Sequence, residues 1–366
     1  MPDADDHRFM SLALALGRRG LGNAWPNPAV GAVVVKDGIV VGRGWTQPGG
    51  RPHAEAQALQ RAGEAARGAT IYATLEPCSH HGKTPPCVDA IIAAGVARVV
   101  SAIEDPNPKV AGQGHARLRA QGITVDVGVG AEEASRAHAG HIRRVRDGGP
   151  HVILKLAVSS DGKVALAGRK PARITGEAAN ARVHLMRAMN DAVLTGIGTV
   201  LADDPQLTCR LPGMERRSPV RVVLDSALRL PPGSRLATSA AQTLVWVFAG
   251  EGISAETERP LVDLGVEVLR VPGAAGRLDL GAVLRGVAAR GITRLMVEAG
   301  PIVSAAFLAA DLVDEAALFR SAVAIGADGI DALDGMPLSA LTLSPKLRLV
   351  ESEQIGADTL EMFERT

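Results

Sequence analysis

Short apolar runs alternate with amphipathic segments through the first third of the chain. Val30–Val35 and Ile39–Gly42 flank the turn sequence Lys36-Asp37-Gly38, so the pattern predicts a β-hairpin there. Further strands are predicted over 70–75, 97–103 and 123–127, and helices over 53–66, 87–94, 115–121 and 131–146. This alternation of strands and helices indicates an α/β layer fold.

The turn-forming sequence Asp147-Gly148-Gly149-Pro150 interrupts this pattern and is the candidate linker. Beyond it, strands are predicted over 151–158, 192–195, 220–224, 244–249, 266–271 and 294–297, and helices over 177–189 and 280–290. We therefore expect two α/β domains, residues 1–147 and residues 151–366. The length of 366 residues agrees with this division, since one domain usually holds roughly one to two hundred residues.

The composition excludes several classes of protein. Hydrophobic residues make up 46% of the chain, which is far too much for a disordered protein. The net charge of +1 and the aromatic content of 2% argue against a nucleic-acid partner, which requires a basic surface or clustered aromatic side chains. A membrane partner is not expected either, because no apolar run approaches the roughly 18 residues that span a bilayer.

The N-terminal sequence and the cysteines favour a cytoplasmic location. The chain starts MPDADDHRF, which is acidic where a signal peptide is basic. Cysteines occur only at Cys78, Cys87 and Cys209, an unsuitable number for a disulfide framework in a chain of this length. Cys78 and Cys87 lie nine positions apart beside histidines, so a metal site has to be considered before a disulfide.

The ordered residues His53, Cys78 and Cys87 are the candidate ligands of a zinc ion. One imidazole and two thiolates leave a tetrahedral zinc with an open fourth position, where a bound water becomes acidic. Glu55 follows His53 by two residues and can carry the proton of that water to a leaving amine. This order matches the known signature of zinc deaminases. The alternative is a buried cysteine pair beside a chance His-Ala-Glu sequence.

Several motifs place the chain close to one family. The stretch Thr74–Cys87 (TLEPCSHHGKTPPC) is preceded by Pro26–Val35 and Pro52–Leu59 and followed by Glu104–Gly114 (EDPNPKVAGQG). In this order the motifs resemble the bifunctional riboflavin-biosynthesis deaminase–reductases of the RibD type, over essentially the whole chain. Eight residues separate the two cysteines, which is that family's own spacing. The resemblance implies a cytidine-deaminase-like α/β/α layered N-terminal domain and a dihydrofolate-reductase-like α/β C-terminal domain.

The same resemblance implies the substrate of the first domain. This is a 2,5-diaminopyrimidinone with a phosphoribosylamino group, whose 2-amino group is removed by hydrolysis. Asn27 is the expected contact to the edge of the base, and His80 and Lys83 are the expected contacts of the pocket and the phosphate. An exposed His-His-Gly-Lys loop without any role is the alternative for the last two.

A strand followed by a helix marks the candidate cofactor site of the second half. The strand ends in Glu298-Ala299-Gly300, and the helix is predicted to start at about Pro301, where proline is favoured. The free N–H groups of such a helix start attract an anion, for example a nucleotide phosphate. An ordinary strand–turn–helix is equally compatible with this segment. No Gly-x-Gly-x-x-Gly follows a strand, so a Rossmann site is not expected.

The resemblance supplies NADPH as the cofactor of the second domain, which opens the ribose to a ribityl chain. It also implies a homodimer or higher homo-oligomer. Matching segments place cofactor contacts at Ala157, Arg173, Thr199, Asp203, Ser226, Gly300, Pro301, Ile302, Val303, Ser304, Ala305 and Ala306. They place substrate contacts at Pro171, Arg187, Leu207, Arg210 and Glu298.

The chemistry of these substrate residues suits a phosphorylated pyrimidine. Arg187 and Arg210 offer planar donors to a phosphate, and Glu298 can accept hydrogen bonds from the pyrimidine. Ordinary salt bridges are the alternative for the two arginines. Arg173 and Pro171 depart from the family, in which tryptophan and serine are frequent at these positions.

Two other functions remain open at this point. One is a zinc-dependent nucleoside or tRNA deaminase with an unrelated second domain, which the zinc motif alone would permit. The other is a zinc-stabilised binding protein without activity, which would have no use for Glu55.

Overall fold

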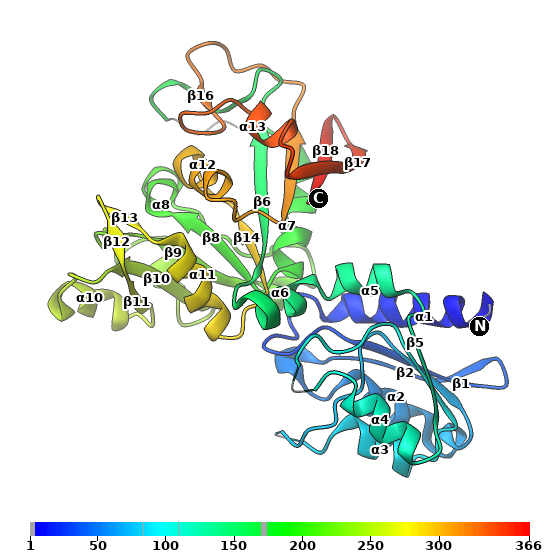
Figure 1. The fold of residues 1–366 in the computed structure, drawn as a ribbon. Coiled ribbons are helices and arrows are strands. Elements are labelled where there is room, and N and C mark those ends of the chain that lie inside the picture. Colours follow the sequence, from blue (N-terminus) through cyan, green and yellow to red (C-terminus); the bar gives the residue numbers. More distant parts are fainter. Residues whose placement is uncertain (1–3, 83, 109, 170–173) are drawn as a thin grey trace. The chain divides into compact units, whose positions relative to one another are not determined.

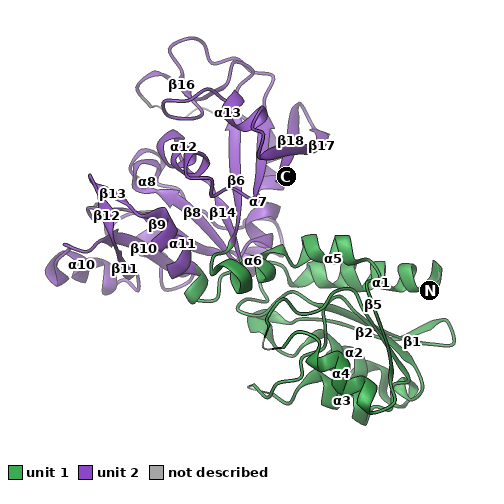
Figure 2. Cartoon of the chain, viewed as in Figure 1, with its two compact units in different colours: residues 1–150, 288–293 green, residues 151–287, 294–366 purple. Residues whose placement is uncertain are grey.

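The computed structural model describes residues 4–82, 84–108, 110–169 and 174–366 (Figure 1). This part of the chain folds into two compact units (Figure 2). The first comprises residues 1–150 and 288–293, and the second comprises residues 151–287 and 294–366. Helices long and apolar enough to cross a membrane are absent from the described residues.

The first unit is built on a mixed sheet with the strand order β2-β1-β3-β4-β5. Strand β1 is antiparallel to β2 and β3, whereas β3, β4 and β5 are parallel to one another. The predicted hairpin is thus β1–β2. The strands are β1 Gly31–Lys36, β2 Ile39–Trp45, β3 Thr70–Ala73, β4 Arg98–Ser101 and β5 Thr124–Val127.

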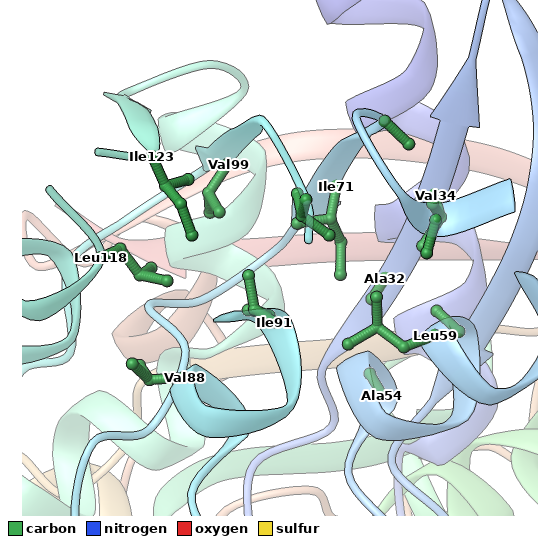
Figure 3. Packing of buried hydrophobic residues seen from close by; sticks show 14 of the residues in the cluster. Ala32, Val34, Ala54, Leu59, Ile71, Val88, Ile91, Val99, Leu118 and Ile123 are labelled. Atoms are coloured by element: carbon green, nitrogen blue, oxygen red, sulfur yellow. The ribbon is translucent and has the colours of Figure 1, made fainter. Parts of the chain in front are cut away.

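Helices cover both faces of this sheet because its side chains are apolar on both faces. Ala32 and Val34 of β1 pack with helices α2, α3 and α4, and Figure 3 shows this core. The alternate residues Val33 and Val35 pack with α1 and α5 on the opposite face. Successive side chains of a strand point to opposite faces of the sheet, so apolar residues at all these positions indicate a strand buried on both sides. The helices are α1 Ala4–Gly17, α2 Ala54–Ala62, α3 Cys87–Ala93, α4 Gln113–Ala120, α5 Ala131–Ala137 and α6 Ala139–Asp147.

The helix predicted over 131–146 is in fact two helices. His138 separates α5 from α6 with backbone angles of φ −97° and ψ 11°. Its ring is buried, and its Nε2 lies 3.0 Å from the hydroxyl oxygen of Thr74. This tertiary contact interrupts a segment whose charge pattern alone favours one continuous helix.

The second unit is built on a sheet with the strand order β11-β10-β9-β8-β14-β6-β15-β18-β17. The strands from β11 to β15 in this order are parallel, and β18 and β17 continue the sheet in antiparallel pairing. These strands are β6 His151–Val158, β8 Ala192–Gly196, β9 Val220–Leu224, β10 Val245–Gly250, β11 Glu267–Val271, β14 Arg294–Val297, β15 Glu315–Arg320, β17 Leu347–Ile355 and β18 Asp358–Arg365.

Most helices of this unit connect parallel strands, as the predicted βαβ pattern requires. Short pairs β7–β16 and β12–β13 lie outside the main sheet. The helices are α7 Glu177–Met189, α8 Ile197–Asp203, α9 Arg235–Thr238, α10 Ala255–Val262, α11 Leu280–Ala289, α12 Pro301–Ala309 and α13 Ser339–Thr342. The short strands are β7 Lys163–Ala165, β12 Gly273–Ala274, β13 Arg277–Leu278 and β16 Ile330–Asp331.

Candidate active sites

The predicted metal ligands come together in the first unit. His53 Nδ1 lies 3.5 Å from Cys78 Sγ and 3.3 Å from Cys87 Sγ, and the donor atoms of all three lie within 4.8 Å of one another. His53 immediately precedes α2, Cys87 is the first residue of α3, and Cys78 follows β3. The starts of α2 and α3 therefore position His53 and Cys87, and the loop after β3 positions Cys78.

The chemistry of this donor set suits zinc. The Cys87 thiol hydrogen-bonds to Cys78 and lowers the pKa of Cys78 to about 4, while the same contact raises the pKa of Cys87. Two thiolates at this separation repel each other. A divalent cation between them removes that repulsion and also matches the imidazole nitrogen, as in sites with one histidine and two cysteines.

Glu55 lies beside this cluster without belonging to it. It is the second residue of α2, and only 3% of its surface is exposed. Burial raises the pKa of its carboxyl, against the opposing charge of His53. A carboxyl group with a raised pKa can both take up and release a proton near neutral pH.

Asn27 contacts the first ligand from the turn before β1. Its side-chain nitrogen donates to the Gly50 carbonyl at 2.9 Å and lies 3.1 Å from His53 Nε2. Gly50 has a φ of 85°, and a Cβ added there would lie 2.8 Å from Asn27 Cγ. The turn therefore needs glycine at position 50 to leave room for the asparagine.

The loop after β4 is fixed by a carboxylate that the sequence did not single out. Glu76 is buried, two residues before Cys78, and accepts backbone hydrogen bonds at 2.8–3.3 Å. The donors are the N–H groups of Asp105, Gly112, Gly114 and His115. Glu76 thus ties the 104–114 segment to the zinc-ligand loop. Its position inside the Thr74–Cys87 motif is the signal that could have identified it.

The two remaining predicted residues of this site are less fully defined. His80 is exposed in the loop between the two cysteines. Lys83 lies outside the described residues.

In the second unit, Glu298 and Arg187 form a hydrogen-bonded ion pair. Glu298 follows β14, and Arg187 of α7 donates to its carboxylate at 2.9 Å from Nε and 2.7 Å from Nη2. Lys155 of β6 lies 3.7 Å from the same carboxylate. Burial raises the pKa of Glu298, but Arg187 and Lys155 outweigh this effect and hold it at about 2. The sequence predicts a strand over 151–158 but indicates no role for Lys155 within it.

Leu207 and Arg210 lie together on the segment after α8, but with different exposure. The Leu207 side chain is buried in an apolar core, and its φ is 54°. Any contact of Leu207 with a ligand must therefore come from its backbone. Arg210 is exposed, and within the described part of the chain its guanidinium makes long contacts of 3.4 Å with Gln206 and Thr208.

The predicted cofactor residues gather at one edge of the second sheet. Ala157 lies near the end of β6, Thr199 follows β8, Ser226 follows β9 and Gly300 follows β14. These strands are parallel neighbours in the order β9-β8-β14-β6, so their carboxyl ends share an edge, where ligands of α/β sheets bind. The Thr199 hydroxyl accepts the Gly300 N–H at 3.1 Å.

Helix α12 begins at this edge with Pro301 in its first turn. Ile302 is 45% exposed, whereas Ser304 and Ala305 are buried and Val303 and Ala306 are partly buried. Asp203, the last residue of α8, is exposed, and partial burial of its carboxyl raises its pKa. Arg173 and Pro171 lie outside the described residues.

Comparison with known proteins identifies the family. Residues 3–103 match the cytidine and deoxycytidylate deaminase zinc-binding region, and residues 150–360 match the RibD C-terminal domain. The riboflavin biosynthesis protein RibD of Escherichia coli (strain K12) is 42% identical over 366 aligned residues, covering 96% of this chain and 97% of that protein. The chain belongs to the RibD family. RibD of Aquifex aeolicus (strain VF5) is 40% identical, with 98% of each chain covered.

Solved RibD structures share the whole fold. RibD of Acinetobacter baumannii superimposes with a TM-score of 0.88 at 36% identity, covering 99% of each chain. The diaminohydroxyphosphoribosylaminopyrimidine deaminase/5-amino-6-(5-phosphoribosylamino)uracil reductase of Thermotoga maritima gives a TM-score of 0.84 at 37% identity, covering 98% of each chain.

Membership of the RibD family confirms several expectations from the sequence. The fold is a cytidine-deaminase-like α/β/α unit followed by a dihydrofolate-reductase-like α/β unit. The chain is a bifunctional enzyme of riboflavin biosynthesis, a deaminase and a reductase, with zinc and NADPH as its cofactors. The roles of single residues stay predictions.

Proposed function

We propose that this RibD-type chain deaminates 2,5-diamino-6-(5-phosphoribosylamino)pyrimidin-4-one to 5-amino-6-(5-phosphoribosylamino)uracil and then reduces the ribosyl group to a ribityl chain. The observation that carries the proposal is the convergence of His53, Cys78 and Cys87 beside the buried Glu55. The name of the Thermotoga maritima relative states the same pair of activities.

In the deamination, the chain's own residues move protons. Zinc held by His53, Cys78 and Cys87 would supply a Lewis acid with an open position, where a water molecule becomes acidic. The water oxygen forms a bond to the carbon that carries the 2-amino group, and the carbon–nitrogen bond then breaks. Glu55 takes a proton from the water and returns it to the departing nitrogen, which leaves as ammonia. Asn27 contacts the edge of the base.

In the reduction, the charged cluster of the second unit orients the substrate. NADPH bound in the second unit would supply the hydride for C1 of the ribosyl group. The bond from C1 to the ring oxygen breaks, and that oxygen gains a proton. Glu298 accepts hydrogen bonds from the pyrimidine. Lys155 lies next to Glu298 and can donate a proton, since burial lowers the pKa of its ammonium group. Arg210 offers its exposed guanidinium to the phosphate.

We assign the deaminase to residues 1–147 and the reductase to residues 151–366. The matched ranges 3–103 and 150–360 support this division. A phosphorylated pyrimidine is the expected partner of both sites, with no nucleic acid or membrane required. We further propose a homodimer or higher homo-oligomer in the cytoplasm, where reduced thiols are maintained.

The test is a reaction with the phosphorylated diaminopyrimidine in which ammonia and NADPH are followed separately, with and without a chelator. Ammonia release should require zinc, whereas NADPH oxidation on supplied deaminated product should not. Turnover of cytidine or of adenosine in tRNA, with none on the phosphorylated diaminopyrimidine, would instead support a nucleoside or tRNA deaminase.

A further inference from the structure

One histidine of α7 contacts the backbone of the predicted substrate segment. His184 lies one turn before Arg187, and its Nδ1 is 3.2 Å from the backbone nitrogen of Arg210 and 3.1 Å from the carbonyl oxygen of Thr208. The nearby Arg187 Nη1 donates to the same carbonyl at 3.1 Å. Helix α7 therefore holds the backbone of this segment at Thr208 and Arg210.

The backbone of this segment requires such support. Asp204 and Leu207 have φ values of 39° and 54°, in the left-handed region that residues with a side chain rarely occupy. Conformations of this kind cost on the order of 1–3 kcal/mol each and persist only where the surroundings enforce them. Leu207 is anchored through its buried side chain, and the contacts to α7 fix the part of the segment that follows it.

The protonation state of His184 decides which of its two contacts forms. An N–H donor can only bind a ring nitrogen that carries no proton, so the Arg210 N–H needs a neutral ring protonated at Nε2. A proton on Nδ1 would instead point at the Thr208 carbonyl. Burial favours the neutral ring and lowers the pKa of His184, as do the charges of Arg187 and Arg210. The Thr208 carbonyl and, to a smaller extent, Glu298 oppose this shift without reversing it.

We infer that His184 is a positioning residue of the reductase, which fixes the Leu207–Arg210 backbone so that Arg210 meets the substrate phosphate. This inference rests on the proposed function, since it assumes a phosphorylated substrate at Arg210. It assigns to His184 no contact with substrate or cofactor. The neutral ring acts only by accepting the Arg210 N–H.

The experiment uses the full chain with two variants, His184→Leu and His184→Asn. Leucine removes the acceptor, whereas the asparagine oxygen stands at the position of Nδ1 and can replace it. NADPH oxidation is followed on supplied 5-amino-6-(5-phosphoribosylamino)uracil. We expect His184→Leu to raise KM about 5- to 30-fold with little change in kcat, as for the loss of one or two kcal/mol. His184→Asn should stay within about threefold of the wild type.

A pH profile supplies a second readout that a merely structural role would not move. In the wild-type enzyme, KM should rise as the pH falls through the pKa of His184, which lies below the ordinary histidine value of 6.5, because protonation removes the acceptor. His184→Asn cannot titrate and should lack this component. Ammonia release by each variant shows that its first unit is folded, and a kcat of NADPH oxidation close to that of the wild type shows the same for the second unit.

The inference is overturned if His184→Leu leaves KM unchanged, if His184→Asn loses as much as His184→Leu, or if the pH profiles of wild type and His184→Asn coincide. If His184→Leu proves too unstable to assay, the two pH profiles still decide. Failure of the proposed function looks different, because the wild-type chain itself would then oxidise no NADPH on this substrate.

Discussion

The guanidinium of Arg187 donates two hydrogen bonds to the carboxylate of Glu298, and the two side chains are largely withdrawn from solvent. The sequence predicts separate tasks for these residues, a contact with the phosphate for Arg187 and with the pyrimidine for Glu298. Their pairing means that Arg187 first neutralises and orients Glu298. It leaves Arg210 as the more exposed guanidinium of the site.

Loss of Arg187 should therefore destabilise the protein. Arg187→Met leaves the Glu298 carboxylate without its main partner, and breaking a buried pair in this way costs about 3–5 kcal/mol. Urea unfolding of the full chain should show this fall in the free energy of unfolding. Arg210→Met is the matched control: it should change stability by only about 0.5 kcal/mol while raising KM for the phosphorylated substrate. Equal stability of the two variants would contradict the pairing.

The same pair makes stability depend on pH. The pKa of Glu298 is about 2 in the folded protein, against an ordinary value of 4.5. A lowered pKa means that the stabilisation is complete above about pH 4.5 and is lost as the pH falls towards 2. Glu298→Gln should flatten the acid limb of the curve of unfolding free energy against pH. An acid limb of unchanged steepness in the variant would show that other groups cause it.

Zinc binding should depend on two of the three cysteines, Cys78 and Cys87. Cys78→Ala and Cys87→Ala each remove a ligand, so the purified variants should contain little zinc and release no ammonia. Cys209→Ala is the control, because Cys209 is buried in the other unit and should not affect zinc. Metal content per chain is measured by atomic spectroscopy. Full zinc occupancy in Cys78→Ala would exclude this ligand set.

The turn before His53 offers a matched pair of glycine substitutions. Gly49 and Gly50 have similar φ values of 73° and 85°, but only at Gly50 would a Cβ meet Asn27, at 2.8 Å from its Cγ. Gly50→Ala should therefore displace Asn27 and lower deaminase kcat/KM by about tenfold or more, since such a misplacement weakens the fit to the transition state. Gly49→Ala carries the backbone strain alone, and the open space around it should leave the activity much closer to wild type. Similar losses in both would point to backbone strain rather than to Asn27.

Much of the fold follows from local patterns. The hairpin β1–β2 and the buried strand β6 each have a clear period of apolar residues between turn signals. Strand β17 was missed because its sequence LRLVESEQI is polar and mostly exposed, and its place is decided by pairing with β18. The break at His138 was missed for a similar reason, since a contact with Thr74 from a distant strand produces it.

The residues of the candidate sites likewise differ in whether the sequence alone could reveal them. His53, Cys78 and Cys87 could be found from the sequence because their residue types and order are characteristic of one chemistry. Lys155 could not, because an isolated lysine in a strand acquires meaning only through its neighbours in space. Glu76 was missed although its position inside the Thr74–Cys87 motif could have identified it. The pairing of Arg187 with Glu298 likewise joins residues 111 positions apart.

The central claim is that one chain carries two separate active sites, and two single variants test it most directly. Glu55→Gln should lose ammonia release by at least roughly a hundredfold and still oxidise NADPH on supplied deaminated product. Lys155→Met should show the reverse, and a mixture of the two variants should carry the diaminopyrimidine through both steps. Loss of both activities in either variant, or a mixture that fails to complete the conversion, would contradict the account.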